Sequence, residues 1–123
     1  ARCRHVISEN DRVLRGVEHL AHGEWEAFGR LVTLSHRSLR DDFEVSHPFI
    51  DRLVDTAGSV EGVLGSRITG AGFGGCTVSL VARDAIPEFR RRVEPLLAGQ
   101  GSGAGVIVVE RAIEAGPLPR GLW

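Results

Sequence analysis

A cluster of glycines in the second half of the chain holds the residue types and spacing that could do chemistry. Four glycines fall within the six positions 70–75, in the run Arg67-Ile68-Thr69-Gly70-Ala71-Gly72-Phe73-Gly74-Gly75-Cys76. Glycine is the costliest residue to order, so such a cluster is typical of a backbone that must reach positive φ or approach another group closely. Successive backbone N–H groups in a loop of this kind can bind an anion such as a phosphate.

The residues of the loop leave a second interpretation open, in which the glycines only make a close turn between two strands. The run also lacks the Gly-x-x-x-x-Gly-Lys-Ser/Thr pattern, in which a lysine reaches a phosphate and a hydroxyl holds Mg²⁺. The hydroxyl of Thr69 could reach the loop or a ligand, although such hydroxyls more often bond their own backbone. An independent nucleotide site is therefore not expected from this run alone.

The other reactive side chains form no catalytic or metal-binding pattern. Cys76 alternates with Val78 and Leu80, which predicts a buried small hydrophobe and not a nucleophile. Asp41 and Asp42 diverge at a helix end and are expected to cap it or to pair with Arg37 or Arg40. Metal-ligand spacing is absent from the five histidines, which are His5, His19, His22, His36 and His47. We expect no catalytic residue and no metal site in this chain.

Bulk composition places the chain among ordinary globular domains. It has 123 residues, 42% hydrophobic and 25% charged, which suits one domain with a modest core. A net charge of −1 indicates neither a nucleic-acid nor an anionic membrane partner. No apolar run approaches the roughly 20 residues that a membrane-spanning helix needs. Two cysteines make no disulfide framework, which fits a reducing cytosol.

Three helices are predicted before the glycines. Apolar positions spaced by three or four residues predict a helix over 6–21, which ends with Gly23 as its C′ residue. A second helix is predicted over 24–39, so that the two form a helical hairpin. Ser46 is the expected N-cap of a third helix, in which Pro48 occupies the first turn.

Strands and one further helix are predicted around and after the glycines. β-favouring residues on both sides predict two strands, and Asp84 is expected to cap a fourth helix whose basic run 90–92 faces solvent. The apolar run 105–109 predicts a third strand, central in its sheet. The order ααα-ββ-α-β predicts an α+β fold with an antiparallel sheet packed against helices, resembling a ferredoxin-like βαββαβ unit without its first strand. The expected parts are a helical hairpin at about 1–40, an αββαβ core at about 48–112 and a tail at 113–123.

The start of the chain also bears on its organisation. The sequence contains no methionine and opens on Ala1-Arg2-Cys3-Arg4, inside a pattern that already predicts a helix. The missing first strand would lie before Ala1. We therefore interpret the chain as part of a longer polypeptide, with a processed mature protein as the alternative.

Three stretches resemble the galactokinases of the GHMP kinase superfamily. The glycine run is similar to the third signature motif of that superfamily, and Phe73 is typical of galactokinases, since mevalonate kinases usually carry another glycine there. A second stretch of this chain is similar to the family's sequence before its penultimate helix. It reads Ser35-His36-Arg37-Ser38-Leu39-Arg40-Asp41-Asp42-Phe43-Glu44-Val45-Ser46. The helix that opens the family's C-terminal half is similar to His5-Val6-Ile7-Ser8-Glu9-Asn10-Asp11-Arg12-Val13.

The resemblance implies the C-terminal domain of an enzyme that phosphorylates galactose with MgATP. It assigns to the nucleotide and substrate loop the residues Thr69, Gly70, Ala71, Gly72, Phe73, Gly74 and Gly75. The family's sugar-contacting segment, its phosphate loop and its catalytic aspartate have no counterpart in this sequence. ATP and Mg²⁺ would therefore be bound mainly by an N-terminal galactokinase domain, which is the expected partner, in a cytoplasmic enzyme.

A second function of a different class is also compatible with the sequence. Small ferredoxin-like domains often bind metabolites, and galactokinase-like proteins can serve as sugar sensors, so a non-catalytic regulatory module is the alternative. An intact phosphate loop and catalytic aspartate upstream would favour the enzyme. The sugar itself stays open, because N-acetylgalactosamine kinases share much of this region.

Overall fold

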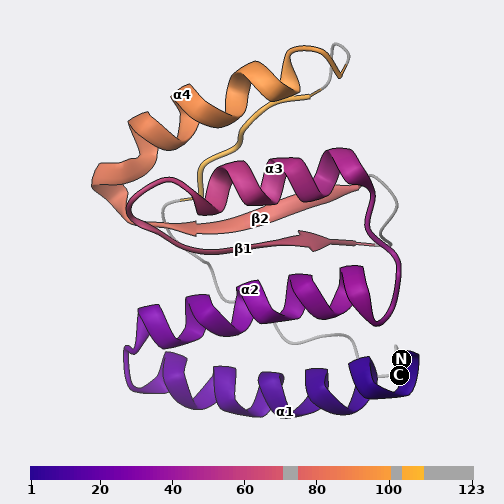
Figure 1. Ribbon diagram of the computed structural model, residues 1–123. Helices are drawn as coiled ribbons and strands as arrows, with labels where there is room; N and C mark the ends of the chain where they lie inside the picture. Colours follow the sequence, from indigo (N-terminus) through magenta and orange to yellow (C-terminus); the bar gives the residue numbers. More distant parts are fainter. Residues whose placement is uncertain (71–74, 101–103, 110–123) are drawn as a thin grey trace, which may run out of the picture.

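The computed structural model describes residues 1–70, 75–100 and 104–109. Its elements follow in the order α1 (Arg2–Ala21), α2 (Trp25–Asp41), α3 (Pro48–Gly58), β1 (Val63–Thr69), β2 (Cys76–Val81), the 3₁₀ turn η1 (Arg83–Ala85) and α4 (Ile86–Leu97). The hairpin of α1 and α2 lies at one end of the molecule and α4 at the other, with the strands and α3 between them (Figure 1). The α+β class predicted from the sequence is therefore confirmed.

The ends of the first three helices follow local signals, with one correction. Gly23 has φ of +68° just after α1, as the C′ prediction required. Pro48 begins α3, but the N-cap is His47 and not Ser46, because the His47 ring accepts a hydrogen bond from the Phe49 amide. Ser46 instead donates to Asp51 Oδ1 at 2.6 Å.

No helix in the described residues is long and apolar enough to span a membrane.

The start of α4 also differs from the prediction. Asp84 does not cap the helix; it lies inside η1, and Ala85 occupies the N-cap position without a side-chain hydrogen bond. A proline in the first turn of α4 lacks one of the amide hydrogens that a cap would satisfy, which reduces the need for an acidic cap. The basic run that follows is solvated and pairs locally, for example Arg91 with Glu88 at 2.6 Å.

A pair of glycines brings α2 into direct backbone contact with β1. A Cβ on Gly29 would collide with the Leu64 carbonyl, and a Cβ on Gly65 would collide with the Gly29 carbonyl. Neither position therefore tolerates a side chain without displacement of the backbone. This close contact places the residues of α2 next to the strand that leads into the glycine loop.

The two strands form a single antiparallel pair among the described residues, with the register Arg67↔Val78, Ile68↔Thr77 and Thr69↔Cys76. Behind β1 lies a small core of buried side chains, in which Ile68 packs against Ile50 and Val54 of α3. A second cluster joins α3 to α4 through Leu53, Ala57 and Val93.

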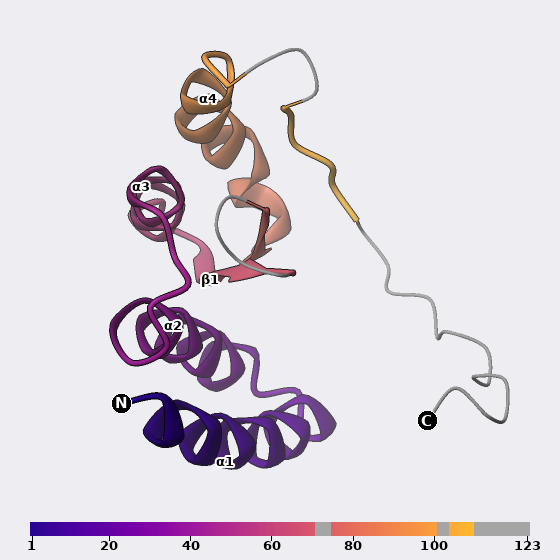
Figure 2. The ribbon, with the colours of Figure 1, turned by 90° about the vertical axis from the view of Figure 1, so that its right-hand side faces the viewer.

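The third strand predicted at 105–109 is not present. Residues 104–109 have no strand assignment, and Figure 2 shows this segment running apart from the sheet. Val106 touches the cluster between α3 and α4, whereas Ile107 is 89% exposed and Val109 is 75% exposed. A strand requires a hydrogen-bonded neighbour, and no described strand lies beside this segment. The predicted tail at 113–123 lies outside the described residues.

Candidate functional site

The glycine loop connects the ends of β1 and β2. The pairing of Thr69 with Cys76 holds the two ends of the loop together, and Gly70 leaves β1 with φ of +82°. That conformation is one that residues with a side chain rarely adopt, so the first glycine of the run has the role expected of it. Thr69, Gly70 and Gly75 are exposed. The predicted site residues 71–74 lie outside the described residues, and their role stays a prediction.

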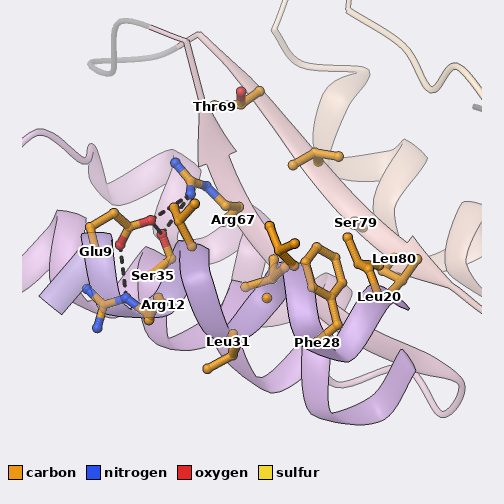
Figure 3. Close-up of a pocket in the computed structure, with 15 residues that line it drawn as sticks. Glu9, Arg12, Leu20, Phe28, Leu31, Ser35, Arg67, Thr69, Ser79 and Leu80 are labelled. Carbon is orange, nitrogen blue, oxygen red and sulfur yellow. Dashed lines mark hydrogen bonds and ion pairs between the residues drawn. The ribbon is translucent and has the colours of Figure 1, made fainter. Parts of the chain in front are cut away.

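Four polar side chains meet at the base of the loop, from three different elements; we refer to Glu9, Arg12, Ser35 and Arg67 as the Glu9 cluster. Glu9 accepts hydrogen bonds from Ser35 Oγ at 2.6 Å and from Arg12 Nε at 2.9 Å. Arg67 donates through Nη1 to Ser35 Oγ at 2.7 Å and to Glu9 Oε1 at 3.2 Å. Figure 3 shows these side chains pointing toward one another from α1, α2 and β1.

The Glu9 cluster keeps its carboxylate ionised. Partial burial alone would raise the pKa of Glu9, but hydrogen bonds from Ser35 and Arg12 and the charges of Arg12 and Arg67 outweigh it, so that the pKa lies below its usual value. With one carboxylate and two guanidinium groups, the cluster carries an excess of one positive charge. One of the two guanidinium groups, that of Arg67, belongs to β1, three residues before Gly70.

A groove of about 600 Å³ extends from the Glu9 cluster between the helical hairpin and the sheet. Beyond its polar end the groove is lined mainly by apolar side chains, namely Val13, Val17, Leu20, Phe28, Leu31, Val32, Val78 and Leu80. Figure 3 shows Leu20, Phe28 and Leu80 gathered at the end away from the charges. Several of these side chains are exposed, among them Val17 at 61% and Val78 at 51%.

Two side chains form hydrogen bonds with the backbone of Ile68, the second residue before Gly70. His36 Nδ1 accepts a hydrogen bond from the Ile68 amide at 3.3 Å, and Arg67 Nε donates to the Ile68 carbonyl at 2.9 Å. The other ring nitrogen of His36 lies 3.2 Å from Asp51 Oδ1, without the alignment of a hydrogen bond. Burial lowers the pKa of His36 below its usual value, although Asp51 opposes the shift.

A second buried polar contact joins the start of α1 to the end of α2. His5 Nδ1 lies 3.0 Å from Ser38 Oγ, and Ser38 donates to Asp42 Oδ2 at 2.9 Å. The neighbouring Asp41 pairs with Arg40, as the sequence predicted.

The three stretches that carry the family resemblance therefore meet in space. Glu9 belongs to the stretch 5–13, Ser35 and His36 to the stretch 35–46, and Arg67 and Ile68 to the glycine run. None of these residues was predicted as a site residue from the sequence. The signal that could have found them is their presence in separate stretches that resemble one family, since residues that act together need not be close in sequence.

One predicted environment is wrong. Cys76 is exposed and not buried, and Val78 on the same face of β2 is 51% exposed. Within the described residues, no group of three His, Cys, Asp or Glu side chains is arranged to hold a metal ion.

Comparison with known proteins identifies the family. Residues 17–95 match the family model described as "GHMP kinases C terminal". The chain is 60% identical over 90 residues to a galactokinase of Roseiflexus sp. (strain RS-1), covering 73% of this chain and 23% of that protein. It is 50% identical over 98 residues to the galactokinase of Homo sapiens, covering 80% of this chain and 25% of that protein.

A solved structure agrees in both sequence and fold. The galactokinase of Lactococcus lactis, crystallised with galactose, aligns with a TM-score of 0.72 and 44% identity, over 76% of this chain and 24% of that one. The chain thus spans about a quarter of the length of these relatives. The resemblance inferred from the three stretches is confirmed, and the chain belongs to the GHMP kinase C-terminal family, within which it is similar to the galactokinases.

Proposed function

We propose that this chain is the C-terminal part of a galactokinase, an enzyme that phosphorylates galactose with ATP to give galactose 1-phosphate. The observation that carries the proposal is the 50–60% identity to galactokinases over 90 to 98 residues of this chain. Residues 69–75 would complete the nucleotide and substrate site. The activity as a whole would depend on a partner domain that supplies the phosphate loop and the catalytic carboxylate.

The contribution of this chain to the reaction would be positioning. Phosphoryl transfer is catalysed mainly by holding the reacting groups in line and by stabilising charge on the γ-phosphate. The backbone amides of the loop would face the substrates, and Gly70 allows the chain to turn sharply at the loop entrance. The described residues offer no carboxylate cluster for Mg²⁺, so the ion that accompanies ATP would be held by residues of the partner domain.

We further propose that the partner domain covers the apolar groove and completes the sheet. The groove exposes Val13, Val17 and Val78, side chains that are normally removed from water at an interface. A strand from outside this chain would pair with the free edge of β2 and with residues 105–109, which gives the ferredoxin-like order. Two free cysteines in the described residues suit the cytoplasmic location that this proposal includes.

The unfilled sheet position makes a separate test possible. We expect the isolated chain to self-associate through the free strand edge, because unpaired strand edges are sticky. Multi-angle light scattering should therefore give a mass above that of a monomer of 13.3 kDa. A stable monomer over a wide concentration range would contradict the proposed open position.

A chimaera tests the proposed activity. The chain replaces the matching segment of the Lactococcus lactis galactokinase, and galactose-dependent formation of ADP is measured with a coupled assay. We expect activity from the chimaera and none from the isolated chain, which lacks the phosphate loop. A folded but inactive chimaera would contradict the proposal, and binding of galactose by the isolated chain would favour the sensing alternative.

A single glycine distinguishes a catalytic loop from a plain turn. A Cβ at Gly70 would meet no atom of the described residues within 4 Å, but Gly70→Val forces a side chain onto φ of +82°, which costs roughly 1–2 kcal/mol of backbone strain. We expect the active chimaera to lose far more activity than stability. Gly99→Val is the matched control, since it also enters open space and has no positive φ. Equal and small effects of both variants would identify a plain turn.

A further inference from the structure

Ile68, the residue of β1 just before Thr69, has its backbone hydrogen-bonded on the side away from β2. A two-stranded sheet leaves each strand with one edge that has no strand neighbour, and the polar groups on that edge need other partners. Ile68 finds both partners in side chains, the amide in His36 and the carbonyl in Arg67. Its own side chain is 2% exposed and packs on α3. Ile68 is thus fixed on every side.

His36 is itself held firmly. The residue is 2% exposed, and the close contact between Gly29 and β1 fixes the helix that carries it. Because Nδ1 accepts a hydrogen bond, the ring proton of the neutral imidazole must be on Nε2, which lies 3.2 Å from Asp51 Oδ1. Asp51 in turn accepts a hydrogen bond from Ser46 at 2.6 Å. A chain of contacts therefore runs from the α2–α3 connection through the imidazole to the loop entrance.

We propose that His36 is a positioning residue for the glycine loop, which fixes the direction in which Thr69 and Gly70 leave β1. The inference rests on the proposed function, in which this loop faces the nucleotide and the sugar. Fixing the end of β1 matters there, because a displacement of about 1 Å at a reacting group can cost on the order of a hundredfold in rate. His36 touches no substrate in this assignment and acts through the backbone of Ile68.

Two amide variants separate the two ends of the imidazole. The oxygen of Asn occupies nearly the position of Nδ1, so His36→Asn can still accept from the Ile68 amide. His36→Gln places its amide near the position of Nε2 and loses the bond to Ile68. His36→Ala removes both ends, and His22→Ala is the matched control, because His22 is exposed on the α1–α2 connection and its ring bonds the Glu18 carbonyl of α1.

The first experiment uses the chain itself and does not depend on the proposed function. Nitrogen-15 NMR should show the neutral ring of His36 with its proton on Nε2. Hydrogen exchange of the Ile68, Thr69 and Gly70 amides should become about tenfold faster in His36→Gln and His36→Ala, as expected when one hydrogen bond of about 1.4 kcal/mol is lost. His36→Asn and His22→Ala should exchange like the parent. A proton on Nδ1, or faster exchange in all His36 variants alike, would overturn the proposal.

The second experiment uses the active chimaera, at a temperature where every variant is folded. We expect kcat to fall about tenfold in His36→Gln and His36→Ala, with KM for galactose changed much less, and to be largely retained in His36→Asn. Losses that follow only the melting temperature, or equal losses in the Asn and Gln variants, would mean that His36 is merely structural. If the chimaera is inactive, the proposed function fails while the exchange experiment still decides whether His36 fixes the loop entrance.

Discussion

The two strands pair along their length, yet the chain surrounds them very differently. In β1, Gly65, Ser66 and Ile68 are buried, and the strand contacts both α2 and α3. In β2 no residue is buried, although its sequence Cys-Thr-Val-Ser-Leu-Val is the more apolar of the two. The more hydrophobic strand is therefore the more exposed one. The burial of a strand is decided by what packs against it, and the described helices pack far more extensively against β1 than against β2.

The largest effect is expected where α2 contacts β1. Gly29→Val should destabilise the chain by about 3 kcal/mol or more, because the new side chain meets the backbone of Leu64 and not a flexible side chain. Urea unfolding followed by circular dichroism measures the loss. Gly58→Ala is the control, since a Cβ there meets nothing within 4 Å, and its stability should change by no more than about 1 kcal/mol. Equal effects would show that the close contact does not hold β1.

A pair of truncations compares the two strands directly. Ile68→Ala should cost about 2–5 kcal/mol, because its side chain is 2% exposed and leaves a cavity. Val78→Ala, at 51% exposure, should cost less than about 1 kcal/mol in the isolated chain. Both losses of free energy are to be measured by urea unfolding, and the denaturant dependence (m) should be the same in the two variants and the parent. In the active chimaera the Val78 variant should become more costly if a partner domain covers β2. A large cost of Val78→Ala in the isolated chain would break the contrast between the strands.

The hydrogen bonds that Arg67 makes around β1 should contribute less to the free energy of unfolding than the apolar packing of the strand. Arg67→Met keeps most of the side-chain volume but removes the donors to Glu9, Ser35 and the Ile68 carbonyl. Because Arg67 is partly exposed, we expect a destabilisation of only about 1–2 kcal/mol. Arg83→Met, at an exposed position in η1, is the matched control and should be close to neutral. If Arg67→Met leaves the stability unchanged, water replaces the hydrogen bonds of the Glu9 cluster with no loss of free energy of unfolding.

The smallest effect should appear in the pH dependence of stability. The pKa of His36 is lowered in the folded chain, so around its ordinary pKa of about 6.5 the unfolded state binds more protons. The stabilisation is present above pH 6.5 and is lost as the pH falls from there through the folded pKa. Urea unfolding between pH 7.5 and 5.5 should show this decline, with Asp51, Asp55 and Arg40 as the nearby charges.

His36→Asn should remove this part of the decline, and Glu9 should not interfere, since its lowered pKa confines its titration to more acidic pH. An unchanged pH profile in His36→Asn would show that other groups cause the decline.

Local signals in the sequence predicted the four helices and the two paired strands. The period of apolar residues located four helices, and Gly23 and Pro48 marked their boundaries, because these effects depend on neighbours within one or two turns. The glycines between two β-favouring runs predicted a loop between paired strands, and Gly70 has the positive φ that such a loop requires. The caps proposed at Ser46 and Asp84 were wrong, because nearby residues offered competing solutions.

What the sequence by itself determined is the four helices, the antiparallel hairpin around the glycines and the family, all of which depend on short stretches of residues. Only the tertiary structure decided that Cys76 is exposed, that 105–109 forms no strand among the described residues, and that His36 meets Ile68. The last contact joins residues 32 positions apart. Such outcomes depend on which distant segments come together, and the free energy of that association belongs to no single stretch of the chain.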